Sequence, residues 1–341
     1  MMLTKVFDYN NLIRFKLECD PDLSARISNN LEPCISTNSQ SPDCSIKINQ
    51  AHPPIKIIKD KRLAYLTVTK SQVEHREVVN YRRYGTDVRT INSLDRCNYI
   101  VNTNTELDEE SGLICIKNHL RNNQVVSDKP YVFASLVEVD GRGILIAGPK
   151  RYGKTTFMTY LLQEQKANLV SDDKLILDSY EGKALGLYVP GSIRVRFSTI
   201  SDSNLAVALD NLPITDATQY LDPDAITKII ATKSYYVDEG LVFSRKSFCE
   251  ILKVNSTERC FIDTVIFQRY APRDKAKLKR LDTDEGRYRL NNIGLYQEKY
   301  LGADLMYNTH VNLDEKMYKI KEFFELSYSC MSDLFKQSLR L

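Results

Sequence analysis

The second half of the sequence predicts an α/β fold, and three neighbouring features support this. Short β-rich runs at Val137–Val139 and Ile144–Ala147 flank an Asp-Gly dipeptide, which is typical of a hairpin turn. A helical pattern of apolar residues follows over Thr155–Lys166. Two further short runs, Leu169-Val170 and Leu175–Leu177, predict strands on either side of an aspartate pair. A helix that alternates with strands in this way is typical of α/β proteins.

Composition and charge exclude several classes of protein. The chain has 341 residues, 43% hydrophobic and 27% charged, which is typical of a globular protein and excludes collagen-like and wholly disordered chains. Its 47 basic and 44 acidic residues give a net charge of +3, which does not indicate a dedicated nucleic-acid binder. No apolar run is long enough to cross a membrane, and no secretory signal is recognisable. We therefore expect a cytoplasmic protein with no membrane partner.

The cysteines and histidines do not suggest a metal centre. The eight cysteines are scattered, none of them form a Cys-x-x-Cys motif, and none lie at zinc-site spacing from the four histidines. In a reducing compartment they are expected to be free thiols, mostly in the core.

The first half of the chain is weakly patterned, and we expect a mixed α+β domain over residues 1–128. Strands are predicted at Leu12–Leu17, Leu63–Thr69 and Gly112–Lys117, and capping-box spacing at Ser71 predicts a helix to Tyr84. Residues 30–55 and 102–111 are polar and are predicted to be surface loops. This domain would supply acceptor recognition or contacts in a homo-oligomer.

The second domain is predicted to cover residues 129–341. Besides the strands and helix already described, Thr264–Phe267 predicts a buried strand, and Asp222-Pro223 predicts the start of a helix that runs to Lys233. Asp314 is expected to cap a long amphipathic helix whose apolar side extends to Phe335.

One motif carries chemistry. The segment Gly148-Pro149-Lys150-Arg151-Tyr152-Gly153-Lys154-Thr155, here named the glycine loop, matches the phosphate-binding (Walker A) pattern G-x-x-x-x-G-K-[ST]. It lies between a predicted strand and a predicted helix, as that pattern requires. Its backbone amides and the helix N-terminus, which includes Thr156, can bind phosphate oxygens. The Lys154 ammonium can neutralise phosphate charge, and the Thr155 hydroxyl can bind Mg²⁺.

Two carboxylates follow on the next predicted strand. Asp172 and Asp173 come seventeen and eighteen residues after Thr155, directly after Leu169-Val170-Ser171. One aspartate can hold Mg²⁺ and the other can accept the proton of an attacking hydroxyl, as phosphoryl transfer requires.

These residues resemble the catalytic core of the HPr serine kinase/phosphorylase family and its relatives. The likeness covers Gly141–Asp173, where a glycine turn, strand, loop, helix and Asp-Asp pair occur in the same order. It continues more faintly in Pro190–Arg196, similar to a Pro-x-x-Ile-Arg-x-Arg segment, and in Ile262–Pro272, similar to a strand that ends in Pro-Arg-Tyr. The resemblance spans residues 130–340 and does not place residues 1–128.

The resemblance implies a P-loop kinase core of the HPr kinase and phosphoenolpyruvate carboxykinase type. It implies ATP, or pyrophosphate, as phosphoryl donor, Mg²⁺ as cofactor and a hydroxyl as acceptor. Carried over, Asp172 is the candidate general base and Asp173, with Thr155, the magnesium-side group, although the order of the two aspartates stays open. Arg194, Arg196 and Arg269 are candidates for phosphate or acceptor contacts.

The sequence also departs from that family. Phe133 stands where the family has a functional histidine, Arg151 replaces the middle glycine of the loop, and the glycine-rich segment after the aspartate pair is missing. HPr is therefore not expected as the substrate. Because Asp172 would lie beside Mg²⁺ and Lys154, its pKa is expected to be lowered. With Phe133 unable to titrate, the reverse reaction, phosphorolysis, is expected to be negligible.

Three functions remain open from the sequence. The first is an ATP- and Mg²⁺-dependent kinase that acts on a Ser/Thr hydroxyl of a protein or peptide, or on a small metabolite. The second is a nucleotide-binding regulatory module without phosphotransfer. The third is an RNA hydroxyl kinase, suggested only by the net charge and by the basic run Arg273–Arg280.

Overall fold

The computed structural model divides the chain into two compact units, one that contains Met1–Ser127 and one that contains Asp128–Tyr296 and the last strand. It describes residues 2–9, 13–32, 35–37, 41–50, 67–73, 76–83, 87–93, 98–103, 112–113, 115–117, 119–120, 129–149, 152–203, 205, 240–270, 276–293 and 320–328. Each unit has a mixed composition of helix and strand, and each is described separately below.

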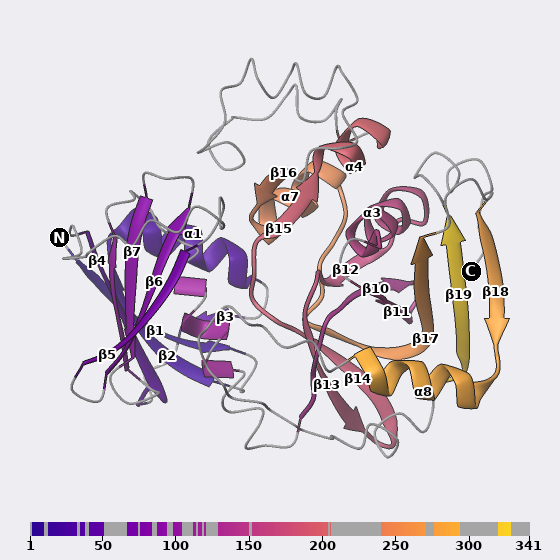
Figure 1. Cartoon of the computed structure of the whole chain (residues 1–341), viewed down its shortest axis with the longest axis horizontal. Helices are drawn as coiled ribbons and strands as arrows, with labels where there is room; N and C mark the ends of the chain where they lie inside the picture. Colours follow the sequence, from indigo (N-terminus) through magenta and orange to yellow (C-terminus); the bar gives the residue numbers. More distant parts are fainter. Residues whose placement is uncertain are drawn as a thin grey trace. The chain divides into compact units, whose positions relative to one another are not determined.

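The first unit is built on an eight-stranded mixed sheet (Figure 1). The strand order is β3-β1-β2-β4-β8-β7-β6-β5, and β4 runs parallel to both β2 and β8. Helix α1 (Pro21–Leu31) packs against β1 and β2 with Leu23, Ile27 and Leu31 buried on one stripe. The strands are β1 (Leu3–Tyr9), β2 (Ile13–Cys19), β3 (Ile35–Thr37), β4 (Cys44–Gln50), β5 (Thr67–Val73), β6 (Arg76–Arg83), β7 (Asp87–Ser93) and β8 (Asn98–Thr103).

Three predictions for this unit are wrong. The helix expected from Ser71 is instead the hairpin of β5 and β6, because β-branched residues there favour a strand over the local capping signal. The strand expected at Gly112–Lys117 is helical, with Leu113, Ile116 and Leu120 buried at helical spacing. The loop expected over residues 30–55 contains β4, which alternates buried Cys44, Ile46 and Ile48 with outward-facing polar residues.

The second unit is an α/β structure around a nine-stranded sheet. Its main path is β12-β10-β11-β17-β14-β13-β9, and β19 and β18 continue from β17. The strands of this sheet are β9 (Tyr131–Val132), β10 (Ala134–Val139), β11 (Arg142–Ala147), β12 (Asn168–Ser171), β13 (Leu175–Tyr180), β14 (Lys183–Tyr188), β17 (Arg259–Tyr270), β18 (Lys277–Leu281) and β19 (Glu322–Tyr328). A separate two-stranded sheet pairs β15 (Ile193–Arg196) with β16 (Gly240–Phe243).

The sheet branches at the long strand β17. One edge of β17 pairs in parallel with β11, while its other edge pairs first with β14 and then with β19. The parallel pair brings Ala147, the last residue of β11, opposite Phe267. The chain that leaves β11 therefore emerges beside the second half of β17.

Helices cover both faces of this sheet (Figure 1). Side chains from α3 (Lys154–Glu164), α4 (Phe197–Asp202) and α7 (Arg245–Leu252) form one core with Ile144 and Ile146 of β11. Leu290 of α8 (Thr283–Ile293) belongs to the core on the other face, with Leu145 and Phe323. Gly286 permits this close approach, since a Cβ there would lie 2.2 Å from the Phe323 ring.

Most sequence predictions for this unit are confirmed. The hairpin of β10 and β11, helix α3, strands β12 and β13, and the buried strand within β17 all occur where the pattern placed them. The predicted helix from Asp222 and the start of the one from Asp314 lie outside the described residues. The part of the latter helix that falls on described residues is wrong, because residues 322–328 form β19 between β17 and β18, and its end beyond residue 328 also lies outside the described residues. A strand covered on both faces has no strict alternation, so its apolar residues imitate helical spacing.

Candidate functional site

The glycine loop connects the end of β11 to the start of α3, as predicted. Gly148 lies against β17, and a Cβ there would approach the Gln268 backbone oxygen to 3.2 Å. Gly153 is the N-cap of α3 with a left-handed φ of 88°, a conformation that favours glycine. The two glycines therefore allow the loop to turn tightly between strand and helix. Lys150 and Arg151 lie outside the described residues.

The Lys154 ammonium turns back over the loop. Its Nζ donates hydrogen bonds to the carbonyl oxygens of Gly148, at 3.0 Å, and Pro149, at 3.3 Å. Tyr152 closes a turn by donating its backbone amide to the Pro149 oxygen, and its side chain is exposed. The Lys154 ammonium, which is bonded to two carbonyl oxygens of the loop, can exchange these contacts for the oxygens of an anionic ligand.

The aspartate pair meets the glycine loop at the same edge of the sheet. Strands β11 and β12 run in the same direction because both are antiparallel to β10, which lies between them. The Asp172 carboxylate follows β12 and accepts a hydrogen bond from the Thr155 hydroxyl at 3.1 Å. Ser135 on β10 donates its hydroxyl to the same oxygen, Oδ1, at 3.2 Å. Three elements therefore converge on one carboxylate oxygen.

A tight turn separates the two carboxylates. The Lys174 amide donates to the Asp172 carbonyl oxygen at 2.7 Å, and Asp173 between them has a φ of 65°. The Asp173 amide points to the Ser135 hydroxyl oxygen at 3.5 Å, and its side chain is exposed. Asp172 is thus directed toward Thr155, while Asp173 is presented to solvent beside it.

A buried arginine forms hydrogen bonds to the backbone of strand β12. The Arg245 guanidinium, 1% exposed, donates to the carbonyl oxygens of Leu169, Val170 and Thr257 at 2.6–2.9 Å. It also stacks over the Tyr188 ring, 3.8 Å from its centroid. These bonds fix the strand that leads directly to the aspartate pair.

Burial changes the acidity of Asp172. Desolvation and the neighbouring Asp173 charge raise its pKa to about 7, while the hydroxyls of Thr155 and Ser135 and the Lys154 charge oppose the rise. The expected lowering of this pKa assumes a bound Mg²⁺, whereas the protein without the ion has the opposite shift. The reason is that hydroxyl donors and a distant ammonium do not replace the water that burial removes. The expectation of negligible phosphorolysis, which also depends on Phe133, stays a prediction.

Phe133 occupies the half-buried position that follows β9. The Lys174 ammonium lies 5.3 Å from the centroid of its ring. The face of the Phe133 ring therefore stabilises the Lys174 ammonium next to the aspartate turn. A histidine at this position would instead have a titratable nitrogen.

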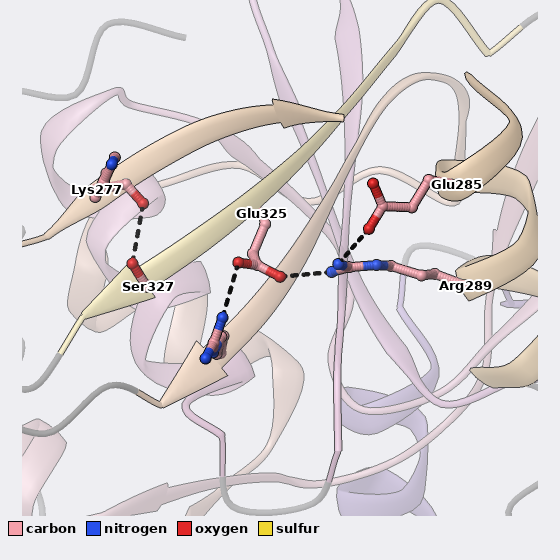
Figure 2. A network of polar contacts seen from close by, with 6 residues as sticks. Lys277, Glu285, Arg289, Glu325 and Ser327 are labelled. Carbon is pink, nitrogen blue, oxygen red and sulfur yellow. Dashed lines mark hydrogen bonds and ion pairs between the residues drawn. The ribbon is translucent and has the colours of Figure 1, made fainter. Parts of the chain in front are cut away.

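The remaining candidates lie around this centre. The Thr156 hydroxyl is hydrogen-bonded to that of Thr199 on α4 at 2.8 Å, which joins the start of α3 to the segment after β15. Arg194 is exposed and Arg196 half-buried on β15, opposite the buried Ile193 and Val195. Arg269 lies near the end of β17, 67% exposed, with its guanidinium 3.5 Å from Glu325. Figure 2 shows the network of Glu325, Arg289 and Glu285 that this contact joins.

The donors at this site suit Mg²⁺. Within the described ranges no cluster of three or more histidines, cysteines or acids could form a metal site by itself. Mg²⁺ is commonly held by one or two protein oxygens together with substrate phosphates and water. The Thr155 hydroxyl and the Asp172 carboxylate, 3.1 Å apart, are such a pair of oxygens.

Sequence reasoning missed Ser135 and Arg245. Each acts across a long stretch of chain, 37 residues from Ser135 to Asp172 and 75 from Arg245 to Val170. The available signal was weak: one polar residue in the apolar run Ala134–Val137, and an arginine next to a capping serine.

The five cysteines that the structure describes as free thiols are all buried, as expected.

Comparisons with known proteins add little. No family model matches the sequence, and no curated protein matches it. Among solved structures, a chain of the Hpr(Ser) kinase/phosphatase from Coxiella burnetii is 16% identical, with a TM-score of 0.22. The match covers 42% of this chain and 61% of that one, so less than two thirds of the matched protein is spanned. In the part of the chain that can be described, no helix is long and apolar enough to cross a membrane.

Proposed function

We propose that the second unit is an ATP- and Mg²⁺-dependent kinase that transfers the γ-phosphate to a hydroxyl group. The acceptor is a Ser/Thr hydroxyl of a protein or peptide, or a hydroxyl of a small metabolite. The observation that carries the proposal is the hydrogen bond between Thr155, at the start of α3, and Asp172, at the end of β12. It brings a loop suited to phosphate and a carboxylate suited to a cation to one edge of the sheet.

The proposed nucleotide site is the glycine loop. We expect the N-terminus of α3 and amides of the loop to bind the phosphates. The Lys154 ammonium would leave the Gly148 and Pro149 carbonyls and bind phosphate oxygens instead. Thr156 stays bonded to Thr199 and supports the helix start. Bound Mg²⁺ would neutralise charge that develops on the transferred phosphoryl group.

The contacts favour an order for the two aspartates that the sequence left open. Asp172 accepts the Thr155 hydroxyl proton at Oδ1, so the Thr155 oxygen and the other carboxylate oxygen of Asp172, Oδ2, are proposed as the metal-side pair. Asp173 is exposed on the adjacent turn and is proposed to orient the acceptor hydroxyl and receive its proton. This order replaces the carried-over expectation that Asp172 is the base and Asp173 the metal-side group.

Nucleotide binding and phosphoryl transfer test the proposal in two steps. Mg-ATP should bind the wild type, and Lys154→Ala should weaken binding and abolish transfer of the γ-phosphate to acceptors from a protein or metabolite pool. The matched control is Lys166→Ala, an exposed lysine just after α3, which should leave both unchanged. Mg-ATP binding with no transfer to any acceptor would instead support a nucleotide-binding regulatory module.

The order of the aspartates has its own test. Asp172→Asn should reduce the Mg²⁺-dependent part of nucleotide affinity, whereas Asp173→Asn should spare binding and lower transfer by about 10²-fold or more. The reverse pattern would restore Asp172 as the base. Equal loss of nucleotide affinity in both variants would contradict a division of roles.

A further inference from the structure

The buried hydroxyl of Ser135 is the feature that neither the sequence motif nor the proposed reaction explains. Strand β10 is apolar around it, and Ser135 itself is 0% exposed. It lies opposite Ile146 of β11, two residues before Val137, so it occupies a position on the α3 side of the sheet that an apolar residue could fill. Burying a hydroxyl there costs free energy unless the hydroxyl is hydrogen-bonded.

The Ser135 hydroxyl acts toward the aspartate pair both as a hydrogen-bond donor and as an acceptor. Its proton is donated to Asp172 Oδ1 at 3.2 Å, and its oxygen faces the Asp173 amide at 3.5 Å. Since the amide can only donate, it directs the single hydroxyl proton toward Asp172. The Ser135 side chain therefore fixes the orientation of the Asp172 carboxylate and the position of the Asp173 backbone amide.

The Thr155 hydroxyl bonds the same oxygen from the other side, at 3.1 Å. With Oδ1 held by two donors on different elements, rotation of the carboxylate would break both bonds. Its second oxygen, Oδ2, is thereby set as the one that a cation or a water would meet. Serine is suited to this task because it is small enough for the strand and carries one rotatable donor.

We propose that Ser135 is a positioning residue of the phosphoryl-transfer site, which fixes the metal-facing oxygen of Asp172 and the turn that presents Asp173. The inference rests on the proposed function, since it assigns Ser135 to the same centre. It predicts that removal of the hydroxyl lowers the affinity for the cation and makes the Asp172–Lys174 turn less rigid. The phosphate contacts of the glycine loop should remain.

The first measurement uses the protein without nucleotide. In Ser135→Ala the Asp173 amide should exchange with solvent about tenfold faster, as followed by hydrogen exchange in peptides that span residues 168–176. The control is Ser203→Ala, because the buried Ser203 hydroxyl also donates to one carbonyl and accepts from one amide in this unit. The control should leave exchange at Asp173 unchanged.

The second measurement uses Mn²⁺ as the probe in the presence of a non-hydrolysable ATP analogue. Ser135→Ala should weaken Mn²⁺ binding, read by electron paramagnetic resonance, by about 10–100-fold, as expected for a residue that orients a metal ligand. Affinity for the analogue in EDTA should stay within about twofold of the wild type. Ser135→Thr, which keeps the donor, should recover most of the Mn²⁺ affinity.

The outcomes separate this inference from the proposed function. If the wild type binds neither the analogue nor Mn²⁺, the proposed function fails, and faster exchange at Asp173 in Ser135→Ala would still support the positioning of the pair. If the wild type binds both and Ser135→Ala retains full Mn²⁺ affinity, the positioning role is overturned. Unchanged exchange at Asp173 in Ser135→Ala would also overturn it.

Discussion

Two polar clusters in the second unit hold carboxylates in opposite ways. Glu325 on β19 faces Arg289 at 2.6 Å and Arg269 at 3.5 Å, so its negative charge is matched by guanidinium groups (Figure 2). Asp172, on the other side of the same sheet, is held by two hydroxyls and lies next to another aspartate. The first arrangement lowers the pKa of Glu325 and the second raises that of Asp172.

This difference distinguishes a stabilising cluster from the proposed phosphoryl-transfer site. A matched carboxylate gains stability from its partners, whereas a half-buried, desolvated carboxylate beside a like charge costs stability unless a cation binds it. The same contrast gives the two clusters opposite dependence on pH, which can be measured.

The largest effect is expected at Arg245, which holds the strand that carries Asp172. Arg245→Met should lower the free energy of unfolding by about 4 kcal/mol, because three buried carbonyl oxygens of Leu169, Val170 and Thr257 lose their donors. Urea denaturation measures the loss. The exposed neighbour offers a control, Lys246→Met, for which a change below about 0.5 kcal/mol is expected. Similar losses in both variants would mean that the clamp contributes little.

The second effect is a gain in stability at the site itself. A carboxyl whose pKa is about 7 when folded and 3.8 when unfolded binds its proton more tightly in the folded state. It therefore favours folding more as pH falls from about 7 toward 4, and it opposes folding above pH 7. Asp172→Asn should raise the free energy of unfolding at pH 8 by about 2–4 kcal/mol in EDTA. The difference should vanish near pH 4, and a loss of stability at pH 8 would contradict the prediction.

Glu325→Gln should behave in the opposite way. The bonds from Arg289 lower the pKa of Glu325 below 4.5, so the stabilisation is present above that pH and is lost as pH falls through the folded-state pKa. At pH 7 the variant should lose about 2 kcal/mol, since a charged hydrogen bond is broken and Glu325 is only 14% exposed. Glu322→Gln is the control on the same strand, because its contact with Arg280 is exposed and 3.6 Å long. Equal losses in the two variants would remove the distinction.

The sequence predicts the helices and strands of the candidate site well where they are close together in the chain. The glycine loop, α3 and the Asp172-Asp173 pair lie within 26 residues, so periodicity and motif spacing place them correctly. The roles of Ser135 and Arg245 are not predicted, because their hydrogen-bond partners depend on the strand order, which no local sequence pattern encodes. The C-terminal strand β19 differs from the predicted helix for a similar reason: parallel pairing with β17 decides its structure. In the first unit, the polar composition of residues 30–55 predicts a loop, although Cys44, Ile46 and Ile48 alternate as in a strand.

The smallest effect on stability is expected at Arg269, and it decides to which cluster this arginine belongs. Its guanidinium is 67% exposed and reaches Glu325 only at 3.5 Å, whereas Arg289 already bonds the same carboxylate at 2.6 Å. Arg269→Gln should therefore cost less than about 0.5 kcal/mol of unfolding free energy. Arg269 lies two residues beyond Phe267, the register partner of Ala147, and so stands at the edge where the glycine loop begins. If it contacts phosphate or acceptor, the same variant should raise the KM for one of them by about tenfold while the melting temperature stays constant. An unchanged KM together with a clear loss of stability would assign Arg269 to the Glu325 network instead.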